Sequence, residues 1–304
     1  MKISLANTLS LCNDRTKKAN INISSGGPES WFKTEHLDKF EINAFSFDFF
    51  VNWESGRLVR TIWLKRFIDI SVNELTKDIN WENTIRHLLI KFEGCEQLKR
   101  LSMFGRSQML NVCFLLFNDD NWSINEGIIY TRLNNDYSID VKVITIDELK
   151  NKIRIGTGKK FNIGRKGLLY STSKLECYLS TTDTPYPGDV DIILSNRDFS
   201  EFKIIEYKKH NLSTPIEEQA LYNYYPNPDR IKYNRLEILR KYLTNAELYT
   251  LYYTTDHRLE TKIELNSNGS NILIQGKSVY LSSPSDKSDT SAVLEYLKKA
   301  LLFN

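Results

Sequence analysis

Two short apolar segments, 187–194 and 202–209, predict a β-hairpin in the second half of the chain. Their residues are largely β-branched or aromatic, the types that strands favour. The link between them, 195–201, is mostly polar and has a length typical of a hairpin connection. We therefore expect an antiparallel strand pair here, with one apolar and one polar face.

The polar residues of this hairpin recur at alternate positions. Because side chains on a strand alternate between its faces, Asp189 and Asp191 project together, and so do Glu206 and Lys208. If the two pairs face one another, two or three carboxylates and one ammonium group meet at one end of a sheet. Mg²⁺ prefers a few carboxylate oxygens together with waters and a substrate phosphate. The alternative interpretation is a solvated hairpin face, since exposed Glu and Lys pairs commonly serve solvation.

The spacing of these residues resembles a known signature. Asp191, followed 15 residues later by Glu206-Tyr207-Lys208, is similar to the motif of the PD-(D/E)XK nuclease superfamily, which includes many restriction endonucleases and Holliday-junction resolvases. The resemblance implies hydrolysis of DNA phosphodiester bonds with Mg²⁺, for which Mn²⁺ substitutes. It also implies metal ligands at Asp191, Glu206 and the main-chain carbonyl of Tyr207, with Lys208 as the catalytic lysine. The similarity covers about residues 168–255.

The match departs from the superfamily pattern at the proline, which does not directly precede the aspartate. Pro187 stands before Gly188-Asp189, so Asp189 is an alternative ligand to Asp191. The Ile-Ile-Leu run after Asp191 fits the superfamily better.

Two further residues are candidates through the same resemblance. Many members carry an additional metal-binding glutamate on the helix before the hairpin, and Glu176 matches that position; the alternative is a capping box between Ser173 and Glu176. RecB-type relatives carry Gln followed four residues later by Tyr on the next helix. That helix is expected to start at Thr214, and Gln219 matches the glutamine, but Asn223 stands in place of the tyrosine.

Basic residues gather in two places that would suit contact with DNA phosphates. Residues 149–175 carry eight basic side chains and no acidic one, and 230–235 form a second group among tyrosines. The predicted DNA-binding residues are Lys159, Lys160, Arg165, Lys166, Arg230, Lys232 and Arg235. The alternative for the first group is a solvated linker.

Aromatic composition indicates two parts. All five Trp precede residue 123, whereas all 16 Tyr lie at or after residue 130. We place the border near residue 148, with an α+β module at 1–148 and a nuclease domain at 149–304. In the module, alternating aromatic residues predict a strand over 45–53, and helical spacing predicts a helix ending near Gly94. The module's role stays open between DNA reading, partner binding and sensing, and no internal sequence repeat is visible.

Several classes of protein are disfavoured. The four cysteines show no C-x-x-C pairing, which predicts reduced thiols rather than a disulfide frame or a zinc site. No stretch reaches the ~18 apolar residues of a membrane helix, and the N-terminus lacks the apolar core of a signal peptide. We therefore expect a cytoplasmic protein without membrane contact. The net charge of +3 does not by itself indicate a nucleic-acid partner.

The sequence thus predicts an α/β protein: an α+β module followed by a restriction-endonuclease-like mixed sheet of order α-β-β-β-α-β. Its expected function is that of an Mg²⁺-dependent DNA endonuclease in restriction or anti-phage defence. Two alternatives remain, a structure-selective repair or recombination nuclease and a catalytically silent nucleic-acid-binding or assembly subunit. DNA is the expected partner, alongside a second copy of the chain or a partner protein of a defence system.

Overall fold

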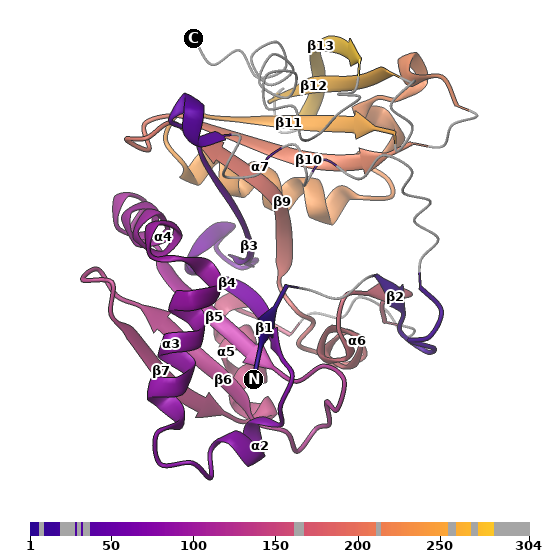
Figure 1. Ribbon diagram of the computed structural model, residues 1–304. Helices are drawn as coiled ribbons and strands as arrows, with labels where there is room; N and C mark the ends of the chain where they lie inside the picture. The colour runs from indigo at the N-terminus through magenta and orange to yellow at the C-terminus, as the bar shows by residue number, and fades with distance from the viewer. Residues whose placement is uncertain are drawn as a thin grey trace. The chain divides into compact units, whose positions relative to one another are not determined.

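The computed structural model has mixed α/β architecture, as the sequence predicts (Figure 1). The chain forms two compact units, one of Met1–Ile21 with Phe47–Asp189 and the other of Asn22–Ser46 with Val190–Asn304. No helix within the described part of the chain is long and apolar enough to cross a membrane. The described residues are 1–5, 9–18, 28, 32, 37–160, 167–210, 214–254, 260–268 and 273–282.

The first unit is a sheet with helices on both faces. Strands β3 and β4 pair antiparallel, β4 and β5 pair parallel across the helices α3 and α4, and β5, β6 and β7 continue antiparallel. Its elements are β1 (Ile3–Ser4), β2 (Ser10–Leu11), β3 (Asn43–Asn52, which starts in the second unit), β4 (Arg57–Ile68), α2 (Val72–Leu75), α3 (Trp81–Glu93), α4 (Cys95–Ser107), β5 (Asn111–Phe117), β6 (Ile128–Leu133), β7 (Ile139–Ile144), α5 (Ile146–Thr157), β8 (Tyr170–Ser171) and α6 (Lys174–Ser180).

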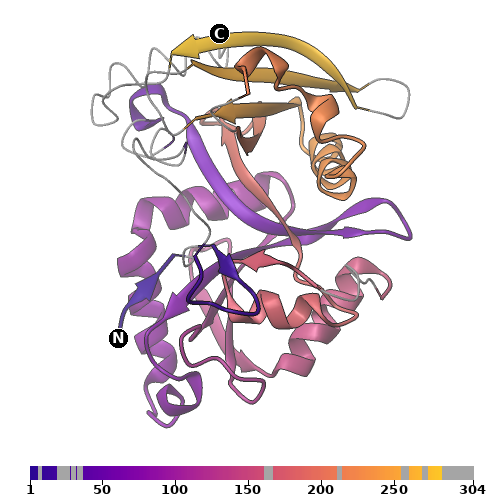
Figure 2. The same ribbon diagram turned by 90° about the vertical axis from the view of Figure 1, so that its right-hand side faces the viewer.

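The second unit contains the predicted hairpin. Strands β9 and β10 pair antiparallel, β10 and β11 pair parallel across α7, and β11, β12 and β13 continue antiparallel. Figure 2 shows β13 as the long curved strand at the free edge of this sheet. The elements are η2 (Asp38–Phe40), β9 (Gly188–Ser195, which starts in the first unit), β10 (Phe202–Lys209), η3 (Ile216–Glu218), η4 (Leu221–Asn223), α7 (Arg230–Tyr242), β11 (Ala246–Tyr253), β12 (Glu260–Asn268) and β13 (Leu273–Ser282).

Both units therefore have the same connectivity: an antiparallel pair, a helical crossover to a parallel strand, and two more antiparallel strands. In the first unit these are β3 to β7, and in the second they are β9 to β13. The sequence shows no corresponding internal repeat. The repeated architecture is a property of the pairing pattern alone.

The core of each unit follows strand alternation. In the first unit Phe50 and Trp63 meet edge to face, with ring centres 4.5 Å apart, under the apolar face of α5. In the second unit Ile192, Ile205 and Leu251 belong to one buried cluster. Asp191 and Glu206 are the sequence neighbours of Ile192 and Ile205, so their side chains point to the opposite face of the sheet.

Helix starts largely match the sequence. Ser173 caps α6 by accepting a hydrogen bond from the Glu176 backbone N–H at 3.2 Å, and α3 ends at Gly94 as expected. The helix predicted from Thr214 is wrong in type: the short 3-10 helices η3 and η4 occupy this region. Backbone groups of this region instead bond to buried side chains of β12. The Leu221 N–H donates to Glu264, and the Gln219 carbonyl accepts from Lys262.

Two expectations about organisation differ from the structure. The segment 149–189, with α5 and α6, lies in the first unit rather than beginning a domain at residue 148, because α5 and α6 bury their apolar faces there. The resemblance also implied a three-stranded meander between two helices. Among the described residues only β9 and β10 stand between α6 and α7, and the sheet is extended after β11 instead.

The expectation of four reduced thiols is wrong for two of them. Cys12 and Cys177 form a disulfide with Cα atoms 5.3 Å apart, although 165 positions separate them in sequence. The short pairing of β2 with β8 brings the two segments together. Cys95 and Cys113 are free, the former exposed and the latter buried.

We expect the disulfide to stabilise the first unit by closing a long loop. Cys12→Ser, or reduction of the wild type, should lower the free energy of unfolding by about 2–4 kcal/mol. Urea denaturation with and without dithiothreitol measures this effect, and Cys95→Ser serves as the control because Cys95 is exposed and free. Equal stability of the oxidised wild type and Cys12→Ser would contradict the assignment.

Candidate functional site

The hairpin brings Asp191 and Glu206 to the same place on one sheet face. The antiparallel register pairs Ile205 with Ile192, so its continuation by one residue sets Glu206 opposite Asp191. The backbone N–H of Tyr207 donates a hydrogen bond of 2.6 Å to Asp191 Oδ2, which fixes the orientation of this carboxylate. Of the predicted polar pairs, Asp191 and Glu206 thus lie opposite each other, as the sequence predicts.

Glu206 is the most deeply buried carboxylate of this group, with an exposed fraction of 1%. Its Oε1 lies 3.0 Å from Lys208 Nζ and 2.9 Å from Lys232 Nζ. Its Oε2 is also buried and has no hydrogen-bond partner among the described residues. A buried carboxylate oxygen without a partner is costly, and such groups call for a functional or ligand-related explanation.

Lys208 lies on the same strand face as Glu206 and makes a second ion pair. Its Nζ is 2.6 Å from Asp229 Oδ2 and lies 4.9 Å from the centre of the Tyr224 ring. Burial favours the neutral amine, but the charge of Glu206 and the hydrogen bond that Lys208 donates to Asp229 outweigh it, so the pKa of Lys208 is raised above its usual 10.5. Lys208 is therefore an ammonium ion held between two carboxylates.

Lys232 occupies an unexpected position. The sequence suggested that it contacts DNA, but its Nζ lies 3.4 Å from Asp191 Oδ1 and 2.9 Å from Glu206 Oε1. Lys232 lies in the first turn of α7, and Asp229 is the residue directly before this helix. Both residues complete the charge balance of the site, and neither could be found from the hairpin motif because they approach it only through the packing of α7 on the sheet.

The carboxylate oxygens of this site are ligands of the kind that a hard divalent cation prefers. Asp191 and Glu206 offer neighbouring carboxylates, one with an unpartnered oxygen, and Mg²⁺ proteins commonly use one or two carboxylates with waters completing the shell. Within the described residues no group of three or more His, Cys, Asp or Glu side chains is arranged around a common point. The Lys232 ammonium lies near both carboxylates, where it supplies a positive charge of its own.

Gln219 lies in a neighbouring polar cluster of the second unit. Its side-chain oxygen accepts a hydrogen bond of 3.3 Å from the Tyr224 hydroxyl, and its main-chain carbonyl accepts one from Lys262. Lys262 is itself buried beside Glu264, with Nζ and Oε2 3.1 Å apart. Through Tyr224, whose ring faces Lys208, Gln219 connects to the site without touching its carboxylates.

The structure places two other predicted ligands in the first unit. Glu176 accepts hydrogen bonds from Lys65, Ser171 and Thr172, so its carboxylate is fully engaged at the start of α6. Asp189 precedes the second unit and is exposed. Asp191 rather than Asp189 is therefore the aspartate that the hairpin pairs with Glu206.

The basic residues predicted to bind DNA have diverse surroundings. Lys160 is exposed and pairs with Asp183 at 3.3 Å, and Lys159 is exposed as well. Arg165 and Lys166 lie outside the described residues. Arg230 is exposed at the start of α7, whereas Arg235 is half-buried on the same helix.

The first unit holds a counterpart of the site in which one residue differs. The register of β3 and β4 pairs Asp48 with Trp63, and Lys65 follows two residues later, just as Lys208 follows Glu206. Trp63 thus occupies the position of Glu206. It is 1% exposed and packs in the apolar core, so an indole rather than a carboxylate stands at this register position.

Asp48 of this counterpart has a strongly shifted pKa. Its Oδ2 accepts a hydrogen bond of 3.1 Å from the Tyr186 hydroxyl. Burial raises the pKa of Asp48 from its ordinary 3.8 to about 7, against the opposing charge of Lys65. The same burial lowers the pKa of Lys65, which faces Asp48 and Asp189.

We expect Asp48 to make stability depend on pH. Folded Asp48 binds its proton more tightly than the unfolded chain does, so the free energy of unfolding should fall as pH rises from about 4 to about 7 and then level off. The contribution is at most about 1.4 kcal/mol per pH unit within that window.

Urea denaturation at several pH values between 5 and 8 tests this expectation. Asp48→Asn keeps a neutral group at this position and should flatten the pH dependence, whereas the exposed control Asp120→Asn should leave it unchanged. An equally steep fall in Asp48→Asn would show that other groups cause it.

Comparisons with known proteins assign no function to the site, so its geometry is the basis for a proposal. No family model matches the chain, and no significant match occurs among curated proteins or among solved structures.

Proposed function

We propose that the second unit is a metal-dependent DNA endonuclease that hydrolyses phosphodiester bonds. The observation that carries the proposal is the buried Glu206 carboxylate directly beside Asp191 and Lys208, with one oxygen that has no hydrogen-bond partner among the described residues. A solvated hairpin face would not bury a carboxylate to 1% exposure. The resemblance to the PD-(D/E)XK superfamily supports the same chemistry and suggests restriction or anti-phage defence as the setting.

In this proposal each residue has a separate task. Asp191 and Glu206 would hold Mg²⁺ or Mn²⁺, and the Tyr207 N–H keeps Asp191 turned toward the site. A bound divalent cation supplies an acidified water and neutralises developing charge on the phosphate. Lys208, held by Asp229, keeps a positive charge and a proton beside the scissile group, where it orients a water or stabilises the phosphate oxygens.

A catalytically silent nucleic-acid-binding or assembly protein is the second candidate. One observation favours it: the Lys232 ammonium contacts both Asp191 and Glu206 and so balances their charge without a metal. In an active enzyme this ammonium would have to share the carboxylates with the cation or withdraw from them. Metal binding therefore separates the two candidates before any cleavage is measured.

We expect cleavage of DNA to require both the cation and Lys208. Plasmid, linear and branched DNA, together with RNA, should be incubated with Mg²⁺, Mn²⁺ or EDTA, and products followed on gels. Lys208→Met and Asp191→Asn should lower the rate at least 100-fold, since removing a preorganised electrostatic group commonly costs about 10²–10³ in rate.

The matched control for this experiment is Lys209→Met. Lys209 follows Lys208 on β10 but is exposed, and its variant should cut like the wild type. Full activity in EDTA or in Lys208→Met would contradict the mechanism. Preference for branched over linear substrates would favour a repair or recombination enzyme over a restriction enzyme.

We also expect Lys232 to weaken metal binding by competing for the carboxylates. Lys232→Gln should tighten Mn²⁺ binding by about tenfold, equivalent to about 1.4 kcal/mol, while Glu206→Gln should abolish it. Titration of free Mn²⁺ by electron paramagnetic resonance measures both. Lys241→Gln is the control, because Lys241 lies on the same helix and pairs with Glu237 instead; the same affinity in Lys232→Gln as in this control would argue against competition.

A further inference from the structure

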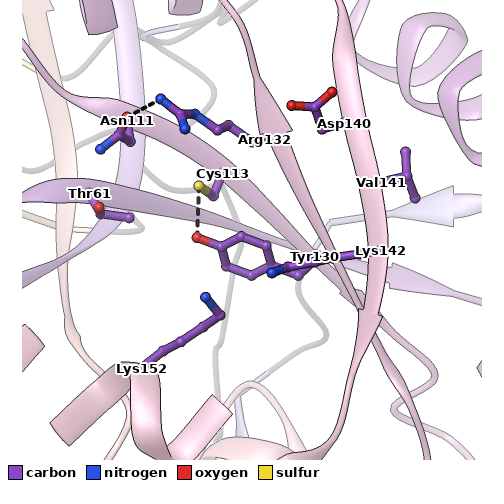
Figure 3. Close-up of a pocket in the computed structure, with 9 residues that line it drawn as sticks. All are labelled: Thr61, Asn111, Cys113, Tyr130, Arg132, Asp140, Val141, Lys142 and Lys152. Carbon is purple, nitrogen blue, oxygen red and sulfur yellow. Dashed lines mark hydrogen bonds between the residues drawn. The ribbon is translucent and has the colours of Figure 1, made fainter. Parts of the chain in front are cut away.

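A pocket in the first unit presents several cationic side chains on the face of the sheet that α5 partly covers. It has a volume of about 380 Å³ and is lined by residues of β4 to β7 and by Lys152 of α5. Figure 3 shows Lys152 reaching from its helix toward the ring of Tyr130, with Arg132 and Asp140 on the far side. This size lies within the range of pockets that bind small organic ligands, roughly 300–1,000 Å³.

Two lysines of the pocket share one aromatic ring. Lys152 Nζ lies 4.5 Å and Lys142 Nζ lies 5.5 Å from the centre of the Tyr130 ring. Neither lysine forms an ion pair with a carboxylate in the described part of the chain. Two ammonium groups gathered around one ring repel each other, and an anion placed near them would relieve that repulsion.

Arg132 adds a third cation in a fixed position. Its guanidinium donates a hydrogen bond of 2.8 Å to Asn111 Oδ1, and the Asn111 amide in turn donates to the Arg60 carbonyl at 2.9 Å. Asp140 is opposite Arg132 in the strand register, yet the two side chains form no ion pair with each other. The guanidinium and the carboxylate are therefore both available to a ligand.

Acidic and neutral groups near the pocket offset only part of this positive charge: besides Asp140, Glu148 of α5 interacts with Lys142 and Lys152, whose charges help to lower its pKa. Tyr130 donates a hydrogen bond of 3.0 Å to Cys113 Sγ, shown as a dashed line in Figure 3. Burial raises the pKa of both the Tyr130 hydroxyl and the Cys113 thiol, so both groups stay neutral at physiological pH. Three cations thus lie near two carboxylates, Asp140 and Glu148, which leaves an excess of positive charge.

We propose that this pocket binds a nucleoside phosphate, with Lys142, Lys152 and Arg132 holding its phosphate groups. The pocket is larger than a phosphate ion requires, and Asp140 supplies an acceptor for the sugar hydroxyls or base amines that a nucleotide carries beside its phosphates. Charge-assisted hydrogen bonds from lysine and arginine are the usual means of binding phosphate.

The position of the pocket in the repeated fold agrees with a binding role. Strand register continues the row from Asp48 and Trp63 through Cys113 and Arg132 to Asp140. Where the second unit has Glu206, this row has Trp63, which packs in the apolar core. The outer residues of the row, Cys113, Arg132 and Asp140, line the pocket.

Calorimetric titration of the full chain in EDTA tests the proposal without occupying the proposed nuclease site. AMP, ADP and ATP are the probes, with adenosine, inorganic phosphate and a short single-stranded oligonucleotide as comparison ligands. We expect saturable binding of at least one nucleotide, tighter than that of phosphate or adenosine and weakened by added salt. The double variant Lys142→Gln/Lys152→Gln should lose affinity at least tenfold.

Two controls complete the experiment. Lys91→Gln removes an exposed lysine of α3 outside the pocket and should bind like the wild type. Asp191→Asn should also retain nucleotide binding, so that failure of the nuclease proposal and failure of this one can be told apart. The proposal is overturned if no nucleotide binds more tightly than phosphate, if only the oligonucleotide binds, or if the double variant keeps its affinity.

Discussion

Burial of the Glu206 carboxylate is the interaction on which the second unit depends. A charge at 1% exposure is tolerated only with compensating partners, and here two lysines supply them from different elements, Lys208 from β10 and Lys232 from α7. Asp191 and Asp229 then balance the lysines in turn. The packing of α7 on the sheet therefore also supplies part of the charge that compensates the Glu206 carboxylate.

This arrangement is consistent with a site whose positive charges are already in place. The Lys208 Nζ lies 4.9 Å from the centre of the Tyr224 ring and 5.5 Å from that of the Tyr233 ring. A bound cation and the lysines would compete for the same carboxylate oxygens. The proposed nuclease and the silent fold would therefore differ in their affinity for metal.

The two units use one connectivity for different ends. Equivalent register positions hold Glu206 in one unit and Trp63 in the other, so an indole of the apolar core stands where the second unit has a buried carboxylate. Asp48 and Lys65 remain as a buried pair in the first unit and are stabilised by Tyr186 and Glu176. The outer strands β5 to β7 of the first unit line the cationic pocket around Tyr130.

Local patterns in the sequence determined the mixed α/β class, the alternating strands β3, β9 and β10, the cap of α6 and the placement of Asp191, Glu206 and Lys208 on the polar face of the hairpin. These follow from side-chain periodicity and capping chemistry, which act between residues close in the chain. The metal, the DNA substrate and the defence setting remain predictions. For Gln219 and for the basic residues of 149–175, the sequence indicated the residue types but not the contacts that they make.

Only the tertiary structure decided which distant residues meet. It paired Cys12 with Cys177, brought Lys232 to the carboxylates, assigned α5 and α6 to the first unit and revealed the repeated connectivity. The cationic pocket around Tyr130 likewise joins residues of separate strands and a helix. Such contacts depend on strand register and on which faces bury together, and neither is encoded in the spacing of residues along a single segment.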